Sequence, residues 1–458
     1  MKRVLFVSYY YPPIGGVGGQ RVVRFAKYLP EQGWEASVLA AEPNEFFSSS
    51  DSIPAEPPEE RVIRSTVLEP NRLANAILSS RKEPSLQEQL PINEKGTLNV
   101  RALREEFREL PLSLRAKLRA WLFIPDDRIG WIPEATRDGL GILHKASFDC
   151  IVSTSAPYTA HLVALRLARR TGLPWIADFR DPWSSNTFQF FPTELHQKAQ
   201  AWLERIVVER CDCVLTCSEG FREDFWQRYP SLQRDKFAVI TNGFDPADFP
   251  EPMPEPYPCF TISYVGDFYG PQTPLFFLLG LRQLLDRRPE AARSIQILFV
   301  GPFESRVRPL VEALGLLEIV QFLGFLSHER AIDVLRRSHA LLLVLGTKRG
   351  GERIYPAKAF EYLAACKPIL GLAPDGLLRD LLKEAGVAFL VNPTSEEAIS
   401  KAIERLFLAY QAGELPDFIE PANLSRFNGR SLAKELAMVL EKTLTNKQLE
   451  QSLKGKKR

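Results

Sequence analysis

The 458-residue sequence predicts an α/β protein with two domains, each built around a doubly wound parallel sheet. Three observations support this fold class. At the start, a buried strand (Lys2–Ser8) is followed by a Gly-rich loop, an amphipathic helix (Gln20–Gln32) and a second strand (Trp34–Ala40). The same alternation of strands and helices returns after residue 260. A Pro-rich segment, Pro246–Pro258, separates the two halves and is typical of a linker.

The N-terminal domain is expected to span residues 1–250. Gly33 follows the first helix and is predicted to cap it in a left-handed conformation. Four further strands are expected, at Cys150–Thr154, Trp175–Asp178, Val214–Cys217 and Ala238–Ile240. Residues 43–130 interrupt this pattern. Because the first part of this stretch is rich in Pro, Ser and Glu, we expect an insertion outside the core.

The C-terminal domain is expected to span residues 251–420. Its predicted strands are Thr261–Gly266, Ile295–Gly301, Val320–Leu323, Ala340–Leu345, Ile369–Leu372 and Ala388–Val391. Helices are expected between them, followed by one at Glu396–Tyr410. A last helix within residues 421–445 is a candidate for packing back on the N-terminal domain. Residues 446–458 are polar and Lys-rich, and are predicted to form a disordered tail.

Composition excludes several classes of protein. A net charge of +2 argues against a nucleic-acid binder held by bulk electrostatics. Cys211, Cys213 and Cys217 cluster, but neither a CxxC pair nor a nearby His completes a metal site, so we interpret them as core thiols and expect no metal. No apolar run is long enough to cross a bilayer. The N-terminus lacks a small-residue cleavage site, and a cytoplasmic location is expected.

The segment Gly350–Pro368 carries the strongest site signal. Pro356 suits the first position of a helix, whose exposed amides and dipole favour a phosphate. Lys358 adds a positive charge in that turn, and Glu361 projects from the same helix face. A carboxylate there can accept hydrogen bonds from two neighbouring hydroxyls of a ribose. This combination indicates a nucleotide site, and the alternative is a surface helix with a solvated Lys and Glu.

A second set of candidates lies at strand ends in the first half. The loop containing Gly15 and Gly16 follows the first strand, where doubly wound sheets bind ligands. It is longer than the dinucleotide fingerprint, and no acidic residue ends the second strand, so hydride transfer is not expected. Asp178, Arg180 and Asp181 lie at the carboxyl end of another predicted strand. They are candidates for binding or catalysis, and a structural Arg–Asp pair is the alternative.

The segment Leu112–Phe123 predicts a basic amphipathic helix. Leu114, Leu118, Trp121 and Leu122 alternate with basic residues. Such a helix, with a Trp at its edge, could lie on an anionic membrane surface. The alternative is a helix packed on its own domain with solvated basic side chains, and both interpretations stay open at this point.

Several motifs together resemble a known family. They are YYPPIGGVGGQR, SAPYTAH, PWIADFRDPW, CSEGF, TNGFD, YVGDF and YPAKAFEYLAACKPIL. The sequence is similar to retaining glycosyltransferases of family 4, which have the GT-B fold of two Rossmann-like domains facing across a cleft. The resemblance covers nearly the whole chain except the insertion and the tail. The most similar subgroup consists of bacterial enzymes of surface-polysaccharide assembly.

The resemblance implies that the C-terminal domain binds a nucleotide-sugar donor. Glu361 matches the second Glu of the family's E-x7-E motif, which binds the ribose. Ile354 stands at the first Glu position, and Glu352 lies two residues away. The basic pair that usually follows YVG is missing from GDFYGPQTP, so Lys358, and also Arg353, are expected to supply charge.

Other positions follow from the same resemblance. The donor site is expected to include Gly15, Gly16, Gly266, Tyr355, Lys358, Ala359 and Glu361. Arg180 falls near a position where related enzymes often carry a His, and His161 is an alternative polar ligand at a helix start. A single His is more often structural than a ligand.

The expected reaction transfers a sugar from a nucleotide diphosphate to an acceptor hydroxyl, with retention and without a metal or other cofactor. The acceptor is expected to be a sugar or a lipid-linked sugar, in the synthesis of a cell-surface polysaccharide or glycolipid. Expected partners therefore include an anionic membrane surface at its inner face, but not nucleic acid. Two alternatives stay open: a sugar-nucleotide epimerase of the same architecture, and a non-catalytic protein that binds sugar nucleotides.

Overall fold

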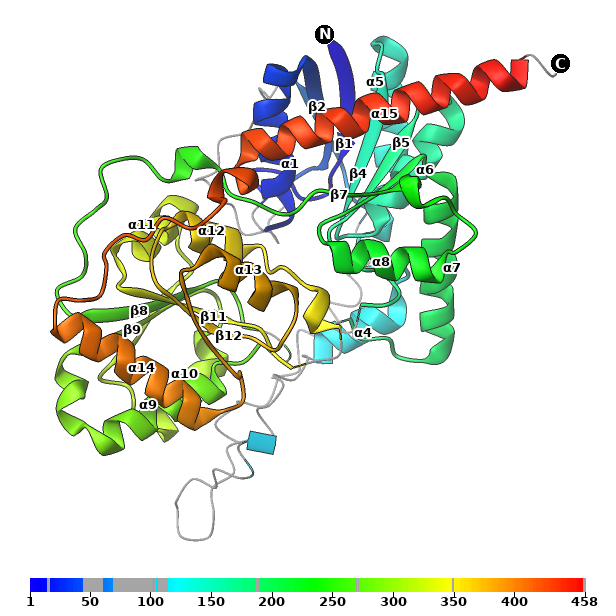
Figure 1. Cartoon of the computed structure of the whole chain (residues 1–458). Helices are drawn as coiled ribbons and strands as arrows, with labels where there is room; N and C mark the ends of the chain where they lie inside the picture. Colours follow the sequence, from blue (N-terminus) through cyan, green and yellow to red (C-terminus); the bar gives the residue numbers. More distant parts are fainter. Residues whose placement is uncertain are drawn as a thin grey trace. The chain divides into compact units, whose positions relative to one another are not determined.

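The computed structural model describes residues 1–14, 17–43, 61–68, 102, 104–105, 114–186, 189–268, 270, 272–347 and 350–455. The chain forms two compact units. The N-terminal unit comprises Met1–Arg81, Leu114–Asp245 and Ser425–Arg458, and the C-terminal unit comprises Lys82–Ser113 and Pro246–Leu424. Both are parallel α/β units, as the alternation of strands and helices predicts (Figure 1).

The N-terminal unit has a seven-stranded parallel sheet in the order β3-β2-β1-β4-β5-β6-β7. Its strands are β1 (Lys2–Val7), β2 (Trp34–Ala41), β3 (Val62–Ser65), β4 (Cys150–Ser155), β5 (Trp175–Phe179), β6 (Cys213–Thr216) and β7 (Phe237–Val239). The strand order reverses between β1 and β4. The loops that leave these two strands therefore diverge, as at the ligand sites of doubly wound sheets.

Helices cover both faces of this sheet. They are α1 (Val17–Tyr28), α4 (Leu114–Leu122), α5 (Ile132–Lys145), α6 (Thr159–Thr171), α7 (Glu194–Arg210), α8 (Glu219–Arg228) and α15 (Gly429–Gly455). One core cluster joins the sheet to α5, α6 and α7, and the other joins it to α1 and α15. The central strands β5 and β6 are buried along their whole length, which explains why apolar residues predominate in them, whereas the edge strands β3 and β7 are partly exposed.

The first helix ends earlier than expected. α1 stops at Tyr28 and continues as a 3-10 turn, η1 (Leu29–Gln32), because Pro30 has no N–H to donate within a continuing α-helix. Gly33 has a φ of 81°, and its N–H donates to the carbonyls of Leu29 and Pro30. The left-handed cap predicted at Gly33 is therefore confirmed.

The C-terminal unit has a six-stranded parallel sheet in the order β10-β9-β8-β11-β12-β13. Its strands are β8 (Phe260–Val265), β9 (Ile295–Val300), β10 (Val320–Gly324), β11 (Ala340–Val344), β12 (Ile369–Leu372) and β13 (Ala388–Val391). Its helices are α9 (Leu275–Arg287), α10 (Glu304–Ala313), α11 (His328–Arg337), α12 (Lys358–Ala364), α13 (Leu377–Ala385) and α14 (Glu396–Gln411). The strand order reverses between β8 and β11.

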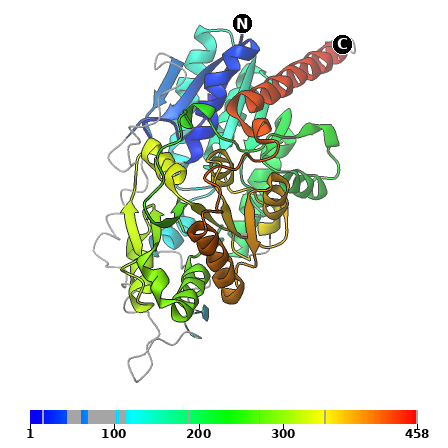
Figure 2. The ribbon, with the colours of Figure 1, turned by 60° about the vertical axis from the view of Figure 1, so that its left-hand side comes forward.

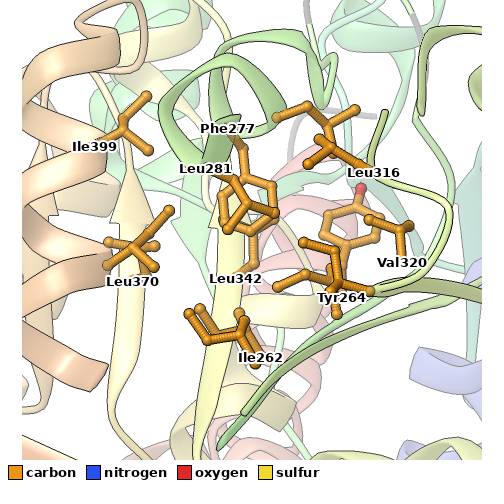
Figure 3. Close-up of a cluster of buried hydrophobic side chains, with 14 of the residues drawn as sticks. Ile262, Tyr264, Phe277, Leu281, Leu316, Val320, Leu342, Leu370 and Ile399 are labelled. Carbon is orange, nitrogen blue, oxygen red and sulfur yellow. The ribbon is translucent and has the colours of Figure 1, made fainter. Parts of the chain in front are cut away.

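The core of this unit lies between its sheet and the pair α9 and α14. Figure 3 shows Ile262, Leu342 and Leu370, from three neighbouring strands, beside Leu281 of α9 and Ile399 of α14. Each of these side chains is fully buried. Gly280 of α9 is needed for this packing, because a Cβ there would lie 2.8 Å from Ile399 Cγ2. The core therefore fixes the carboxyl ends of the central strands β8 and β11.

Several boundaries differ from expectation. Val62–Ser65 lies within the expected insertion but forms the edge strand β3, which pairs with β2. The two units divide after Asp245 rather than at residue 250, and after Leu424 rather than at residue 420. α15 continues to Gly455, across most of the segment expected to be a disordered tail. The remaining described part of the expected insertion includes α4, which belongs to the N-terminal unit.

The last helix, α15, packs on the N-terminal unit. Figures 1 and 2 both show this long red helix beside the blue segment that contains α1. Its buried residues follow helical spacing and join the core cluster of β1 and β2: Leu432, Ala433, Leu436, Ala437 and Leu440. The N-terminal unit is therefore completed by residues from the end of the chain.

Candidate donor site and neighbouring strand ends

Two glycine-containing turns lie at the carboxyl ends of neighbouring strands, at the candidate site in the C-terminal unit. Gly266 follows β8 with a φ of 132°, and Gly301 follows the neighbouring β9 with a φ of 150°. The N–H of Gly266 donates to the carbonyl of Val300 at 2.9 Å. A Cβ on Gly301 would lie only 1.9 Å from the carbonyl oxygen of Gly266. Only glycine fits such a close approach of two backbones, so these turns are fixed against each other.

The helix α12 begins beside the first of these turns. It follows β11 in the chain, and the sheet reverses its order between β11 and β8, so α12 lies at a topological switch point. The hydroxyl of Tyr362 accepts a hydrogen bond of 2.9 Å from the N–H of Val265, the last residue of β8. Tyr362 is fully buried. It therefore anchors the helix to the strand whose carboxyl end forms the site.

The start of α12 differs in detail from the prediction. The helix begins at Lys358, two residues after Pro356, which was expected at its first position. The N–H of Ala359 donates to the carbonyl of Pro356 at 2.9 Å. Because this amide is already engaged and Ala359 is fully buried, the geometry favours a packing role for Ala359 over the predicted contact with the donor.

Lys358 reaches from α12 into the turn after β8. Its Nζ donates to the Tyr264 hydroxyl at 2.6 Å and lies 3.9 Å from the centre of that ring. The Tyr264 hydroxyl in turn donates to the carbonyl of Asp267. A Cβ on Gly266 would lie 2.5 Å from Nζ, so the missing side chain of this glycine makes room for the amino group. A basic group therefore lies at the loop that lacks one in its own sequence.

The surroundings of Lys358 change its acidity. Burial lowers the pKa of its amino group to about 7, and the carboxylates of Asp267 and Glu361 act in the opposite direction. The favourable contact with the Tyr264 ring does not replace the lost hydration. An anionic ligand beside this group would raise its pKa again, so protonation and anion binding at this position are coupled.

Arg306 is a second cation at the same turn, and the sequence analysis missed it. From α10, its Nη2 donates to Asp267 Oδ1 at 2.5 Å and its Nη1 to the carbonyl of Phe268 at 2.9 Å. α10 follows β9, which lies next to β8 in the sheet, so neighbouring strand ends bring the two residues together. Only the position of Arg306 after a predicted strand could have indicated it.

Glu361 and the residues that precede α12 have different surroundings. Glu361 lies in the first turn of α12 and is partly buried. Glu352 lies in a separate 3-10 turn, η8 (Gly351–Arg353), where its Oε2 accepts from the N–H of Gly350 at 2.8 Å. Ile354 and Tyr355 are partly buried, and the Tyr355 ring packs edge-on against Phe360. Glu352 is thus held by its own turn, with Arg353 3.6 Å from its other oxygen.

In the N-terminal unit, Asp178 forms a buried ion pair with Arg21 of α1. Its carboxylate accepts from Arg21 Nε at 3.0 Å and from Thr154 Oγ1 at 3.0 Å. The same guanidinium donates to the carbonyls of Ile240 and Thr241. Both charged side chains are only 3% exposed. The geometry therefore favours the structural alternative for Asp178, with Arg21 as its partner rather than Arg180.

His161 also lies inside the core. It is fully buried on α6, with its ring centre 4.4 Å from that of Phe179. Ser153 Oγ accepts from Trp175 Nε1, so its own proton is available for His161 Nδ1 at 2.8 Å. Burial lowers the pKa of His161 to about 3, which keeps it neutral. These contacts favour a structural role over the predicted polar ligand.

The other N-terminal candidates lie near the surface or outside the described residues. Arg180 is partly buried, and its Nε donates to the carbonyl of Ser155 at 2.5 Å, in the loop that follows β4. Asp181 is exposed beside it. The predicted donor residues Gly15 and Gly16 lie outside the described residues. Of the N-terminal candidates in the described part of the chain, Arg180 and Asp181 are thus the ones that a ligand could reach.

The described part of the chain shows neither a metal-binding cluster nor a membrane-spanning helix. No group of three or more His, Cys, Asp or Glu residues there is arranged to hold a metal ion. Cys211, Cys213 and Cys217 are buried thiols, and burial raises the pKa of each to about 12. Among the same described residues, no helix combines the length and apolarity that a bilayer crossing requires.

Family models match both halves of the chain. A "Glycosyl transferase 4-like domain" matches residues 15–243, and "Glycosyl transferases group 1" matches residues 274–419. The first match lies in the N-terminal unit, apart from Lys82–Ser113, which belong to the C-terminal unit. The second contains α12, with Lys358 and Glu361, together with Gly301 and Arg306, and it begins after the Gly266 turn.

Solved structures with the same fold cover nearly the whole chain. Sucrose-phosphate synthase from Thermosynechococcus elongatus is 18% identical, with a TM-score of 0.57 over 99% of this chain and 100% of that one. Anabaena HepE, in complex with UDP and glucose, is 14% identical, with a TM-score of 0.58 over 96% of this chain and 100% of that one. At these identities the likeness establishes the fold.

A curated relative matches a short segment. The alpha-maltose-1-phosphate synthase of Mycolicibacterium smegmatis is 40% identical over 48 residues, which are 10% of this chain and 12% of that protein. The family assignment therefore depends on the two family models, which together extend over most of the sequence and agree with the two-unit α/β fold. The chain belongs to the glycosyl transferase 4-like family and is a glycosyltransferase of the GT-B fold.

Proposed function

We propose that this glycosyltransferase moves a sugar from a nucleotide-diphosphate donor to an acceptor hydroxyl, with retention of the anomeric configuration. One observation carries the proposal: Lys358 of α12 lies against the Gly266 turn at the switch point of the C-terminal sheet, and Glu361 lies one helical turn further along the same helix. An amino group is suited to a diphosphate and a carboxylate to a ribose diol. Binding of UDP by HepE, a protein of the same fold, supports a nucleotide as the ligand class.

The chemistry asks the protein to stabilise a leaving diphosphate. The bond between the anomeric carbon and the diphosphate oxygen breaks, and its electron pair stays with the diphosphate. The acceptor oxygen forms the new bond to the anomeric carbon and passes its proton to the departing diphosphate, which carries the added electron pair. Protonated Lys358 beside the diphosphate would stabilise the added negative charge without a metal ion. Arg306 would act indirectly, by fixing Asp267 and hence the turn that contains Gly266.

We propose that the acceptor is a sugar or a lipid-linked sugar, in the synthesis of a cell-surface polysaccharide or glycolipid at the inner face of the membrane. Arg180 and Asp181 are the N-terminal candidates for acceptor contacts, since they lie at the end of β5 and are accessible. His161 and Asp178 are buried and would instead maintain the fold. The match of both family models to transferases supports this reaction over the epimerase and the non-catalytic alternatives.

The donor site can be tested with a panel of nucleotide sugars. We expect Glu361→Ala and Lys358→Ala each to weaken binding of the preferred donor by about tenfold or more, because a hydrogen bond to a charged group contributes about 1.5–3 kcal/mol. Titration calorimetry measures the affinity, and release of the nucleoside diphosphate with a lipid-linked acceptor measures turnover.

Matched substitutions serve as controls. Lys383→Ala and Glu384→Ala change the same residue types on exposed positions of α13 in the same unit. We expect both to keep the affinity of the unmodified protein. Donor affinity unchanged in both Glu361→Ala and Lys358→Ala would refute the site. Anomeric configuration of the product, read by nuclear magnetic resonance, tests retention separately, since an inverted product would contradict it.

A further inference from the structure

One edge of the C-terminal sheet is formed by β13. This strand pairs with β12 on one side, and in the described part of the chain no strand pairs with its other side. Its register with β12 is regular over all four residues. At the opposite edge of the same sheet, the register of β10 with β9 shifts between Phe322 and Gly324. Such irregular pairing is one way in which proteins protect an edge from added strands, and β13 lacks it.

The backbone of β13 directs its polar groups alternately to its two sides. The carbonyls of Val387 and Val391 accept hydrogen bonds of 2.9 and 3.4 Å from β12 and the residue that follows it. Since successive residues of a strand direct their N–H and C=O groups to opposite sides, those of Ala388 and Leu390 face the outer edge. Both residues are partly exposed. The edge therefore presents two donors and two acceptors at the spacing that a further strand requires.

A groove with a volume of about 570 Å³ lies along this edge, and we call it the β13 groove. Six consecutive residues, 386–391, line it, so it follows the whole length of β13. The helix α14 contributes Ala402 and Arg405 to the lining, and the segment that follows α14 contributes Leu415 and Ile419. A groove that follows a strand in this way is suited to an extended ligand.

The charged side chains that line the β13 groove are basic. Lys401 and Arg405 line it, whereas no acidic residue of the described chain does. Lys401 forms an exposed ion pair of 2.6 Å with Glu397, one turn earlier in α14. The Arg405 guanidinium carbon lies 5.4 Å from the centre of the Phe389 ring, and no carboxylate of the described residues lies within ion-pair distance of it. Arg405 is exposed and is therefore available to an acidic ligand.

These features together select an acidic peptide in an extended conformation. A strand added beside β13 would pair its backbone with Ala388 and Leu390 and bring acidic side chains to Arg405. A small apolar anion could use Arg405 but would leave most of the outward backbone groups unpaired. A second copy of this chain fits less well, because pairing of β13 with itself about a two-fold axis would bring like charges from both α14 helices together.

We propose that the β13 groove is a docking site for an acidic, extended segment of a partner protein, which adds one strand to the C-terminal sheet. Backbone hydrogen bonds provide affinity, and Arg405 discriminates against basic segments. The proposal goes beyond glycosyl transfer and does not depend on it. In the sheet order, β13 is separated from β11 and β8, where the candidate donor site lies, by β12.

The test uses the full chain and three fluorescently labelled hexapeptides. The first alternates Val and Glu, and the second alternates Val and Lys. The third has the sequence of the first with every backbone amide N-methylated, so it keeps the side chains and loses the backbone donors. In fluorescence anisotropy titrations we expect the Val/Glu peptide to bind, and each of the other two to bind at least about tenfold more weakly.

Two substitutions test the two parts of the groove. Arg405→Glu should weaken binding of the Val/Glu peptide about tenfold and strengthen binding of the Val/Lys peptide, because it reverses the charge that the peptide meets. Ala388→Pro should weaken binding of the Val/Glu peptide about fivefold, because it removes an outward N–H that the ladder with β12 does not use. Amide hydrogen exchange should show that the bound peptide protects the Leu390 N–H.

A matched variant controls for general surface charge. Arg330→Glu makes the same change at an exposed position of α11 in the same unit, and it should bind the Val/Glu peptide like the unmodified chain. Circular dichroism identifies any variant that fails to fold. If Ala388→Pro fails to fold, Arg405→Glu and the N-methylated peptide still decide the result, since neither changes the backbone of β13.

Four results would overturn the proposal. They are no binding of the Val/Glu peptide at millimolar concentration, equal binding of the N-methylated peptide, equal binding by Arg405→Glu, and a dimer in sedimentation velocity that Ala388→Pro dissociates. The last would assign the edge to a second copy of the chain. Donor affinity should be unchanged in Arg405→Glu. Loss of donor binding in Glu361→Ala leaves the peptide result unaffected, so the two proposals fail separately.

Discussion

At the scale of single residues, Lys358 shows how a charge can be supplied to a loop from a distant part of the sequence. The turn after β8 has no basic residue of its own through Pro274, yet the Lys358 amino group lies over Gly266. Tyr264 receives its hydrogen bond from a residue 94 positions later in the chain. Lys358 therefore places a basic group at the turn where the family resemblance leads one to expect basic residues, and we propose that it takes their part in binding the donor.

Donor affinity should depend on pH through this residue. The Lys358 pKa is lowered to about 7 in the free protein, and a bound diphosphate raises it, so binding above pH 7 requires proton uptake. Affinity for an intact nucleotide sugar should therefore fall as pH rises above 7, by up to about tenfold per unit for one proton. Calorimetry between pH 6 and pH 9, in buffers of different ionisation enthalpy, measures both affinity and uptake.

The intact donor is suitable for this experiment because its diphosphate diester does not titrate in that range. Lys358→Met removes the titrating group, so its weaker binding should show no such slope. A slope of the same size in Lys358→Met would assign the proton to another group. A flat profile in the unmodified protein would mean that Lys358 keeps its charge, or stays neutral, throughout.

Gly301 is the residue with the strictest steric requirement in the site. We expect Gly301→Ala to destabilise the C-terminal unit by more than about 3 kcal/mol, because the added Cβ meets the Gly266 carbonyl in a strained backbone conformation. Gly386→Ala is the matched control: Gly386 also has a positive φ, of 75°, but nothing lies within 4 Å of its Cβ position. Its cost should be about 1–2 kcal/mol.

Urea denaturation of the two variants measures this difference. If both substitutions lower the free energy of unfolding by the same amount, the Gly301 backbone does not lie as close to the Gly266 carbonyl as described. Donor affinity of Gly301→Ala under native conditions adds a second measurement, since displacement of Gly266 would also move the space that the Lys358 amino group occupies.

At the scale of elements, apolar patterns predict strands better than they predict helices with mixed surfaces. The predicted strands Ile369–Leu372 and Ala388–Val391 coincide with β12 and β13, because each is a short continuous apolar run, as is typical of parallel strands. α7 was not predicted. Its core face is partly polar, with Gln200 and Glu204, and its outer face carries Trp202, so its apolar residues do not follow a single stripe.

Short edge strands are difficult for a similar reason. β3 has four residues, VIRS, within a stretch whose composition indicates an insertion. Only its pairing with β2 makes it part of the sheet. The same limit applies to site residues. Local sequence predicts the helix that carries Lys358 and Glu361. It does not predict the contact of Asp178 with Arg21, because the two residues are 157 positions apart and meet only in the tertiary fold.

The helix α15 should contribute strongly to the stability of the N-terminal unit. Leu436 is fully buried against the residues of β1, β2 and α1. Leu436→Ala should therefore cost about 2–5 kcal/mol by loss of apolar contacts and formation of a cavity. Thermal or urea unfolding followed by circular dichroism measures it. Met438→Ala, two residues away but 57% exposed, should change stability by less than about 0.5 kcal/mol.

A small effect at Leu436, equal to that at Met438, would mean that α15 is only loosely attached. A large effect confined to the transition of the N-terminal unit would agree with the packing described. Amide hydrogen exchange assigns the effect to a unit, because protection would fall in β1 and β2 and persist in β8 and β11.

At the scale of the whole molecule, the two units are not two successive segments of sequence. The chain forms most of the N-terminal unit, continues as the C-terminal unit from Pro246 to Leu424, and returns to the N-terminal unit at Ser425. The sequence predicts two α/β units and a connecting linker because each unit repeats the same alternation of strands and helices. The return of the chain is harder to predict, since an apolar helix stripe does not indicate which sheet it will cover.

This connectivity affects the order in which the protein can fold during synthesis. Domains generally fold as units while the ribosome extends the chain from its N-terminus. Here the seven-stranded sheet lacks one of its covering helices until α15, a helix of 27 residues, has emerged. The apolar face formed by residues such as Phe6, Val38 and Phe25 stays incompletely covered while residues 246–424 are translated. The unit that begins first is therefore the one completed last.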